Sequence, residues 1–276
     1  MKFYLENNIM NIFKYVLMFI TVILCTLFMY IMYVQLLLQT RQGNIFEKIY
    51  LINLKRRPDR LLNFNKFYGK SDLKNVPITK FDAIDGSKLD VSMIPLTELA
   101  RSELTQLETT GFRTKHYQLT KGAIGCYLSH VKVWEHILKN SADSVLIFED
   151  DAKVPPNLKR DINEKMHNVP KDWDIVLFGF ICTKCMKYSE YSRVDRFMLT
   201  HCYLIRKQAI IKMMDTNSLF PITQQFDWMM SEMSSILNIY TVNDKLVTPF
   251  ESRTDIQAPL RDKRDKGVYD KPRIKL

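Results

Sequence analysis

The hydrophobic pattern of the chain begins with one long uncharged run. Residues 15–34 are twenty positions without a single charged side chain. At about 1.5 Å rise per residue, a helix of this length spans about 30 Å, the hydrocarbon thickness of a bilayer. A cleaved signal peptide usually has a shorter apolar region, about 7–15 residues, and a small-residue cleavage site. The pattern therefore favours a transmembrane anchor over 15–38, after a short tail over 1–14 and before a connector over 39–45.

Extended and helical patterns then alternate. Short apolar runs typical of strands occupy 49–54, 76–83, 144–148, 175–180, 202–205 and 239–247. Helical patterns begin near Pro58 and cover 120–140, 208–215 and 226–237, with Thr120 placed to cap the second of them. Strands that alternate with helices indicate an α/β domain around a mostly parallel sheet, with helices on both faces. We expect one globular domain over 46–257, followed by a tail over 258–276.

Composition and charge narrow the class. Hydrophobic residues make up 46% and charged residues 25% of the 276 positions, which is close to globular averages and excludes wholesale disorder. Forty basic and thirty acidic residues give a net charge of +10. Residues 260–276 hold seven basic and three acidic side chains, so +4 of that charge lies in one terminal stretch. Such a stretch is more often a solvated end than a nucleic-acid patch, and we expect no nucleic-acid partner.

Orientation in a membrane depends on the charges that flank the apolar run. Lys2 and Lys14 precede it, and Arg41 and Lys48 follow it, so the positive-inside count is a tie. The short amino end is the easier one to leave in the cytosol. We therefore expect a single-pass N-in (type II) protein, its domain in an ER- or Golgi-type lumen if eukaryotic or viral, and otherwise at an inner membrane.

The cysteines leave the redox state open. Cys126, Cys182, Cys185 and Cys202 lie outside the apolar run. One or two disulfides are compatible with this number, and so are reduced core thiols. The Cys182-x-x-Cys185 pair has no second close pair at zinc spacing, so a structural zinc site is not expected there.

An acidic corner follows a buried strand pattern. The apolar run 145–148 leads directly into Glu149, Asp150 and Asp151. Neighbouring carboxylates repel one another, so their placement at an apolar strand end requires a cation or hydrogen-bond donors. In an extended segment Glu149 and Asp151 lie on one side and Asp150 on the other. This pattern favours a seat for Mg²⁺ or Mn²⁺, although a solvated acidic turn is the plainer alternative.

Three arginines follow the first strand. Arg56, Arg57 and Arg60 surround its turn and are expected at the same edge of the sheet as the acids. Guanidinium groups suit phosphate oxygens, and a diphosphate is the usual ligand of an ion bound at such a site. Taken alone, a charged helix start remains the better interpretation of these arginines.

Four ordered motifs resemble glycosyltransferase family 25. Residues 49–60 resemble its "INL-x-R-R-x-D-R" opening, and 81–86 its "A-x-D-G" segment. Residues 119–130 resemble its "L-T-x-G-E-I-G-C-x-L-S-H" helix start, and 148–151 contain its "E-D-D" metal motif. Weaker matches lie at 201–205 and 221–227. One departure is Ala123, which stands where the family usually has Glu.

The resemblance implies a GT-A-type fold, a catalytic domain over 46–257 and inverting transfer from a UDP-sugar such as UDP-galactose. It implies Mn²⁺ or Mg²⁺ held by Glu149, Asp150 and Asp151, with Asp151 central to catalysis. It also implies a glycan or a hydroxylysine-type protein acceptor. By the same resemblance, the donor would contact Asn53, Arg56, Arg57, Arg60, Asp85 and His130.

Asp227 is the first candidate for the general base, and an ordinary carboxylate at a helix start is an equally good interpretation. The alternative function is a membrane-anchored binding protein that keeps the fold without catalysis, which Ala123 favours. A metal-dependent phosphatase or nuclease ranks lower, because the histidines form no paired ligand motif.

Overall fold

The structure is a computed structural model that describes residues 2–40, 45–140 and 142–257, and it divides into two units, Met1–Ile45 and Phe46–Leu276. The first unit is helix α1 (Lys2–Thr40). Its segment Lys14–Val34 has a mean hydropathy of 2.4, and by length and composition it can cross a membrane or serve as a signal sequence. The predicted tail over 258–276 and most of the predicted connector lie outside the described residues.

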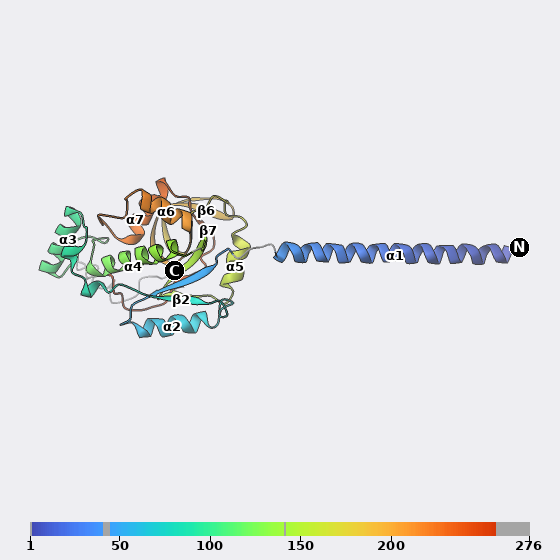
Figure 1. The fold of residues 1–276 in the computed structure, drawn as a ribbon, viewed down its shortest axis with the longest axis horizontal. Coiled ribbons are helices and arrows are strands. Elements are labelled where there is room, and N and C mark those ends of the chain that lie inside the picture. Colours follow the sequence, from blue (N-terminus) through green and yellow to red (C-terminus); the bar gives the residue numbers. More distant parts are fainter. Residues whose placement is uncertain (1, 41–44, 141, 258–276) are drawn as a thin grey trace. The chain divides into compact units, whose positions relative to one another are not determined.

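A six-stranded sheet organises the second unit, in the order β2-β1-β3-β6-β5-β7 (Figure 1). β6 runs opposite to the other five strands, since it pairs antiparallel with β3, β5 and β7. The prediction of an α/β fold with a mostly parallel sheet is thus confirmed. The strands are β1 (Lys48–Asn53), β2 (Ile78–Asp82), β3 (Ser144–Glu149), β5 (Ile175–Lys187), β6 (Tyr191–Arg206) and β7 (Ile239–Val242). A separate two-stranded ladder joins β4 (Ala152–Lys153) to β8 (Thr248–Pro249).

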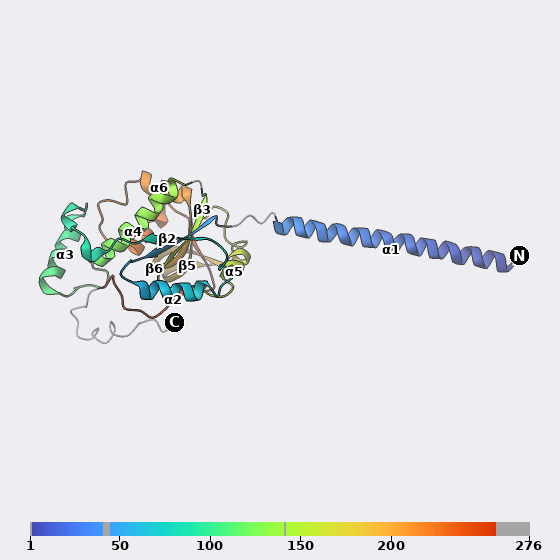
Figure 2. The ribbon, with the colours of Figure 1, turned by 60° about the horizontal axis from the view of Figure 1, so that its bottom comes forward.

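Helices cover both faces of this sheet. Figures 1 and 2 show α2 on one side of the sheet and α4 and α6 on the other. The helices are α2 (Pro58–Tyr68), α3 (Glu98–Thr110), α4 (Lys121–Leu138), α5 (Leu158–Lys165), α6 (Lys207–Asp215) and α7 (Phe226–Glu232). The predicted cap of α4 is confirmed, because the Thr120 hydroxyl accepts a hydrogen bond from the amide of Ala123. α3 and α5 are additions to the predicted set.

Alternation along the strands builds two cores. Tyr50 and Ile147 point to the α4 side, where they join a large buried cluster with Trp134. Phe148 points to the opposite side, and its ring lies 5.5 Å from that of Phe64 on α2. Both faces of β1 and β3 are therefore dry, which explains why these strands read as unbroken apolar runs in the sequence.

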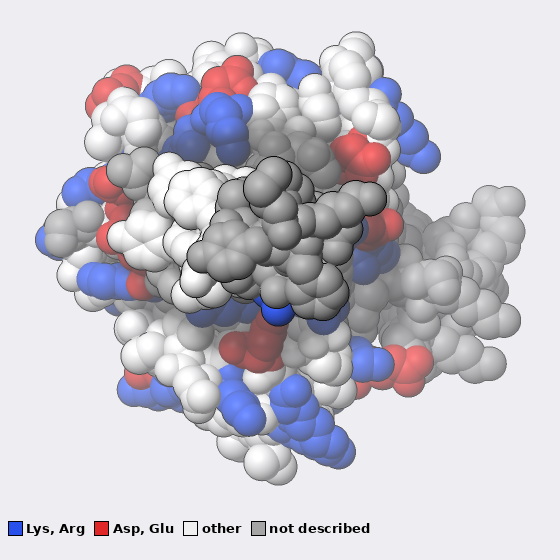
Figure 3. All heavy atoms as spheres, turned by 90° about the vertical axis from the view of Figure 1, so that its right-hand side faces the viewer, with Lys and Arg blue, Asp and Glu red and all other residues white. Residues whose placement is uncertain are grey.

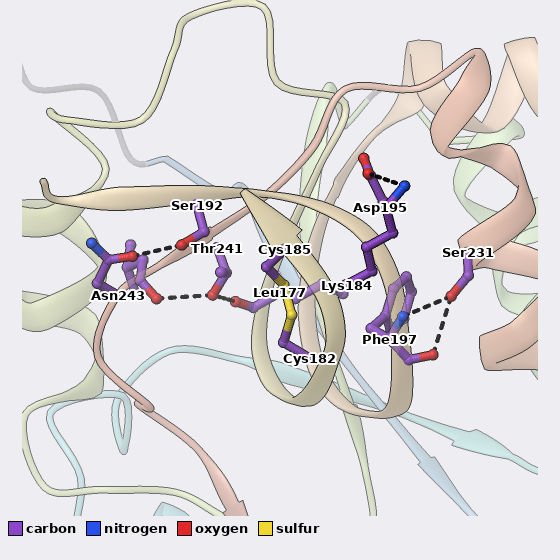
Figure 4. The surroundings of a disulfide bond; sticks show 11 residues. Leu177, Cys182, Lys184, Cys185, Ser192, Asp195, Phe197, Ser231, Thr241 and Asn243 are labelled. Atoms are coloured by element: carbon purple, nitrogen blue, oxygen red, sulfur yellow. Dashed lines mark hydrogen bonds and ion pairs between the residues drawn. A yellow bond between two sulfur atoms is a disulfide. The ribbon is translucent and has the colours of Figure 1, made fainter. Parts of the chain in front are cut away.

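The β5–β6 hairpin is longer than the sequence predicted. The predicted strands at 175–180 and 202–205 are its inner ends. In its outer part β5 is mostly exposed, whereas β6 keeps Ser192, Val194 and Phe197 buried. Figure 4 shows this outer part, with the Cys182–Cys185 disulfide and a Lys184–Asp195 ion pair. Among the described residues, Cys25, Cys126 and Cys202 are free. The apolar positions of this outer part are separated by charged and polar residues, so the sequence shows no continuous apolar run there.

Two predicted elements end earlier than the sequence indicated. The predicted strand over 239–247 stops at Val242, because Asn243 turns to hydrogen-bond the carbonyls of Tyr188 and Ser189. The predicted helix over 226–237 is α-helical only to Glu232 and continues as a 3₁₀ turn over Met233–Ser235.

Charged side chains of both signs share the surface of the second unit. Over the part visible in Figure 3, Lys and Arg side chains lie among Asp and Glu side chains. Many of the pairs are direct contacts, such as Lys165 with Asp244 and Lys121 with Glu108. The most basic stretch predicted from the sequence, 260–276, lies outside the part of the chain that the structure describes.

Candidate functional site

The ends of β1 and β3 bring Asn53 and Asp150 together. These parallel strands pair Ile52 with Glu149, so the next residue of each strand leaves the sheet at the same edge. The Asn53 amide donates to Asp150 Oδ2 at 2.8 Å, and Arg60 Nη1 donates to Asp150 Oδ1 at 2.9 Å. Only 8% of the Asp150 side chain and 12% of the Arg60 side chain is exposed. Asp150 is therefore committed to a buried ion pair with the first turn of α2.

Glu149 and Asp151 meet His201 of β6. One possible ligand atom of each residue lies within 4.8 Å of the others. His201 Nδ1 is 2.9 Å from Asp151 Oδ1, and the Thr200 hydroxyl donates to Glu149 Oε1. The predicted separation of Glu149 and Asp151 from Asp150 is thus seen, although β3 ends at Glu149 and the other two acids lie in the turn that follows. At the acidic corner, Asp150 therefore has a structural role. Glu149, Asp151 and His201 form a separate group, which we call the open cluster.

The open cluster fits a divalent cation. His201 Nε2 is buried and forms no hydrogen bond with any described residue, which is unusual for a buried polar atom unless a ligand satisfies it. Carboxylates suit Mg²⁺ and Mn²⁺, whereas imidazole is a ligand of transition metals. The mixed donor set of Glu149, Asp151 and His201 therefore suits Mn²⁺ better than Mg²⁺.

An irregular stretch of β6 delivers His201 to the acids. Cys202 pairs with Gly179 but Met198 pairs with Ile181, so β6 holds two more residues than β5 across this interval. Leu199 has a positive φ of 69°, a conformation that few non-glycine residues adopt. Bulges of this kind re-aim side chains beside active sites. Here the bulge lets Thr200 and His201 reach the end of β3.

α7 holds the bulge in place. Asp227 Oδ2 accepts the amide of Leu199 at 2.9 Å, and its Oδ1 accepts the amide of Trp228 at 2.8 Å. The Ser231 hydroxyl bonds to both the amide and the carbonyl of Phe197 (Figure 4). Burial raises the pKa of Asp227, and the nearby Glu149 adds to this rise, although the two backbone amides oppose it.

Charge compensation decides the ionisation of the three acids. Burial raises the pKa of Asp150, although Arg60 opposes this effect. Burial also disfavours the charged form of Asp151, but the contacts with His201 and Arg60 outweigh it and lower the pKa of Asp151 to about 2. The pKa of His201 is correspondingly raised by Asp151 against the effect of burial. His130 likewise lowers the pKa of Glu149 against burial.

His130 approaches the acids from α4. Its ring stacks on Phe226 with centroids 3.9 Å apart. Its Nδ1 lies 2.8 Å from the Tyr203 hydroxyl, and its Nε2 lies 3.3 Å from Glu149 Oε1. His130 is thus a buried neighbour of the open cluster, in contact with Glu149.

The other two arginines lie under the C-terminal end of the described chain. Arg56 Nε is 2.9 Å from Asp85, and both Arg56 and Arg57 form ion pairs with Asp255. The carbonyl of Arg253 accepts hydrogen bonds from Arg57 and Arg60 at 2.9 and 3.1 Å. We call residues 253–256 the strap, because they cross this arginine group.

The strap also contacts the start of α4. A Cβ on Gly122 would lie 2.2 Å from the carbonyl oxygen of Asp255, so this glycine permits the close approach. The Thr120 hydroxyl donates to the carbonyl of Ile256. The strap therefore links the two segments that carry the first and third motifs of the sequence.

The profile of glycosyltransferase family 25 (LPS biosynthesis protein) matches residues 46–230. The chain belongs to glycosyltransferase family 25. The family resemblance of the sequence motifs is thus confirmed. A family 25 member from Aedes aegypti is 32% identical over 135 residues, which are 48% of this chain and 21% of that protein.

Vertebrate relatives of this family 25 chain include one named as a galactosyltransferase and one named as inactive. Procollagen galactosyltransferase 2 of Mus musculus is 28% identical over 139 residues, covering 49% of the chain and 21% of that protein. The Homo sapiens "inactive glycosyltransferase 25 family member 3" is 31% identical over 137 residues, covering 49% and 22%. The matched regions span about a fifth of these relatives' length.

Solved structures resemble the family 25 chain more distantly. The galactosyltransferase LgtC, in complex with donor and acceptor sugar analogs, shares 11% identity at a TM-score of 0.39, covering 75% of this chain and 87% of that one. The inositol-1-phosphate CTP transferase from T. maritima shares 11% identity at a TM-score of 0.40, covering 83% and 95%.

The structure brings together most of the residues that the family motifs singled out. Around the acidic corner lie Asn53, Arg60, His130, Glu149, Asp150 and Asp151, with Asp227 behind the bulge. Arg56, Arg57 and Asp85 instead lie along the strap.

Sequence reasoning missed Thr200, His201 and Asp255. The sequence did contain a signal for His201, because this residue directly precedes the apolar run 202–205. Because β6 is antiparallel to β3 and pairs Cys202 with Phe148, the residue before Cys202 faces the one after Phe148. The assumption of parallel pairing concealed that match.

Proposed function

We propose that this chain is a membrane-anchored, metal-dependent inverting glycosyltransferase. It would transfer a hexose, galactose in the first instance, from a nucleotide-diphosphate sugar such as UDP-galactose to a hydroxyl of a glycan or hydroxylysine-type protein. Family membership supports the reaction class. Relatives named procollagen galactosyltransferases support galactose and this protein acceptor.

The observation that carries the proposal is the open cluster of Glu149, Asp151 and His201. Its buried imidazole nitrogen, which has no hydrogen-bond partner among the described residues, and its two carboxylates would form a binding site for Mn²⁺. A divalent cation bound there supplies positive charge against the departing diphosphate. Asp150 of the same motif belongs to the proposed metal site through its neighbours, because it orients the strand end by its bonds to Asn53 and Arg60.

In the proposed reaction, the acceptor oxygen bonds to the anomeric carbon as the bond from that carbon to the diphosphate oxygen breaks. The acceptor hydroxyl loses its proton to a general base. Asp227 is proposed for this role, since its raised pKa makes it a better proton acceptor than an ordinary carboxylate. Arg60 and His130 would line the donor side, with Asn53 at the end of β1.

Asp227 could act on the proton or only on the bulge, and the pH profile separates these roles. Asp227→Asn keeps the side-chain shape but loses both the base and one of the two acceptors for the amides of Leu199 and Trp228. If Asp227 is the base, the Asp227→Asn variant lacks the acidic limb of the kcat pH profile, because that limb reports protonation of the carboxyl group. If kcat falls while the acidic limb persists, Asp227 is a positioning residue and the base lies elsewhere.

The direct test of the proposed function replaces Asp151 by Asn in the full-length protein. We expect Mn²⁺-dependent release of UDP from the donor to fall at least about a hundredfold, as for the loss of a major electrostatic group. Asp161→Asn on α5 is the matched control, since Asp161 pairs only with its surface neighbour Arg160 among the contacts described. Turnover of Asp151→Asn at the control's rate would overturn the assignment.

A non-catalytic family member is the second candidate. Ala123 replaces the usual Glu of the motif, and several curated relatives are named inactive. Ala123 is buried in the core and its amide is capped by Thr120, so helix order does not require the missing carboxylate. The same donor assay decides between the candidates: a folded wild-type protein that never consumes any of several nucleotide sugars supports the second.

Membrane anchoring is proposed from α1. The apolar segment Lys14–Val34 fits a single span, and the Cys182–Cys185 disulfide suits an oxidising compartment for the second unit. Together they favour an N-in orientation, with the domain in a lumen or periplasm. Protection of the domain from protease in sealed microsomes tests this orientation, and cleavage without detergent would contradict it.

A further inference from the structure

A second group of metal-ligating side chains lies beside the open cluster. Cys126 and His130 are four residues apart on α4, so their side chains lie on the same face of the helix. Glu149 faces them from the end of β3. One possible ligand atom of each of the three residues lies within 4.8 Å of the others. The proposed transfer reaction makes no use of Cys126.

The His130–Glu149 spacing is that of two ligands of one ion. His130 Nε2 lies 3.3 Å from Glu149 Oε1, yet this buried nitrogen forms no hydrogen bond with any residue that the structure describes. Two ligands with metal bonds of about 2.0–2.1 Å at a tetrahedral angle lie about 3.3 Å apart. The two atoms therefore have the separation that a shared ion requires.

The surroundings fix the imidazole for ligation through Nε2. The Tyr203 hydroxyl lies 2.8 Å from His130 Nδ1, and Trp134 Nε1 donates to the same hydroxyl at 3.2 Å. The ring is also stacked on Phe226. Ligating histidines in metal sites are commonly oriented in this way through their second nitrogen.

We propose that Cys126, His130 and Glu149 form a site for a thiophilic divalent ion of the zinc type, distinct from the oxygen-rich site for Mn²⁺. One sulfur, one nitrogen and one oxygen ligand suit Zn²⁺, which binds such sets with a fourth position left open. A thiolate disfavours Mg²⁺ and Mn²⁺, which prefer oxygen ligands. Binding forms the metal–sulfur bond and releases the thiol proton to solvent.

The two sites share Glu149. An ion held by Cys126 and His130 draws this carboxylate away from Asp151 and His201, so Zn²⁺ opposes Mn²⁺-supported transfer. This inhibitory consequence rests on the proposed function, whereas the binding of Zn²⁺ does not. The two statements are therefore tested by separate measurements.

Cobalt reports the sulfur ligand directly, with no need for enzymatic activity. The full-length protein in detergent is titrated with Co²⁺, and the thiolate-to-cobalt charge-transfer absorption is recorded. We expect the band in the wild type and in Cys202→Ser, a control that removes a different free thiol, buried and outside the group. We expect its loss in Cys126→Ser. No band in the wild type, or a band that persists in Cys126→Ser, overturns the proposal.

Affinity gives a second measure. We expect Zn²⁺ to bind Cys126→Ser at least about tenfold more weakly than the wild type, and Tyr203→Phe about tenfold more weakly, as for the loss of a group that orients a ligand. If Cys126→Ser fails to fold, Tyr203→Phe decides: unchanged Zn²⁺ affinity in this variant overturns the proposed geometry.

Inhibition is then measured in the donor assay with Mn²⁺ in excess. Zn²⁺ is expected to inhibit the wild type and Cys202→Ser, with the inhibition constant at least about tenfold higher in Cys126→Ser. Equal inhibition of all three proteins overturns the competition for Glu149. If none of the proteins turns over a donor, the proposed function fails while the cobalt result still stands.

Discussion

The ion pair between Arg60 and Asp150 is the contact on which the acidic corner depends most. Arg60→Met keeps most of the apolar stem and removes the charge. Asp150 then remains in a site where only 8% of its side chain is exposed, with Asn53 as its remaining donor among the described contacts. Removing one partner of a buried ion pair destabilises a protein by about 3–5 kcal/mol.

Several details place the expected loss near 3 kcal/mol, the lower end of about 3–5 kcal/mol. Asn53 still satisfies Asp150 Oδ2. The substitution also removes Arg60 Nε, a buried atom without a hydrogen-bond partner among the described residues. Since about 1 kcal/mol corresponds to about 2–4 °C in a domain of this size, the melting temperature should fall by about 6–12 °C.

Urea unfolding followed by tryptophan fluorescence is a suitable assay, because Trp134, Trp173 and Trp228 are the three tryptophans of the chain and all lie in the second unit. Arg160→Met is the matched control. Arg160 is 58% exposed and pairs with Asp161 and Glu164 on the same helix, so its loss should change stability by less than about 1 kcal/mol. Equal destabilisation by the two substitutions would refute the reasoning.

Two further predictions concern the strap and the histidine of the cluster. Asp255→Asn removes the carboxylate that occupies Arg56 and Arg57, so UDP should bind up to about tenfold more tightly, or 1.4 kcal/mol, by calorimetry; weaker binding would show that the strap supports the site. His201→Gln should lower stability most between about pH 4 and 6.5 in metal-free buffer. Asp151 stabilises the native state above its ordinary pKa of 3.8 and loses this contribution as the pH falls towards about 2. His201 contributes below its ordinary pKa of 6.5 and loses this contribution as the pH rises through its higher native pKa. A wild-type-to-variant difference that is constant with pH would contradict this.

The sequence predicted those parts of the fold whose residues are buried on a regular face. β1, β3 and α4 carry unbroken or helical apolar patterns, and the structure confirms them at nearly the predicted positions. The outer half of the β5–β6 hairpin carries no unbroken apolar run, because charged residues such as Lys184 and Asp195 stand between its apolar positions. α5 is short, with only Leu158 and Ile162 buried, which is too few positions to establish a period.

The candidate site was predictable only where one strand supplies it. Glu149, Asp150 and Asp151 are consecutive at the end of β3 and in the turn after it, so their proximity needs no knowledge of the fold. His201 joins them through the antiparallel pairing of β6 and a bulge with a positive φ at Leu199. Both features depend on contacts between distant parts of the chain, so the sequence around residue 149 does not predict them.

The open cluster can therefore form only after β6 has been synthesised. Asp151 and His201 are fifty positions apart in sequence, and the acids are synthesised long before the imidazole that joins them. A product truncated within β5 would carry the whole acidic motif and still lack the His201 imidazole and the Thr200 hydroxyl. The order of synthesis thus delays assembly of the cluster until β6 has paired with β3.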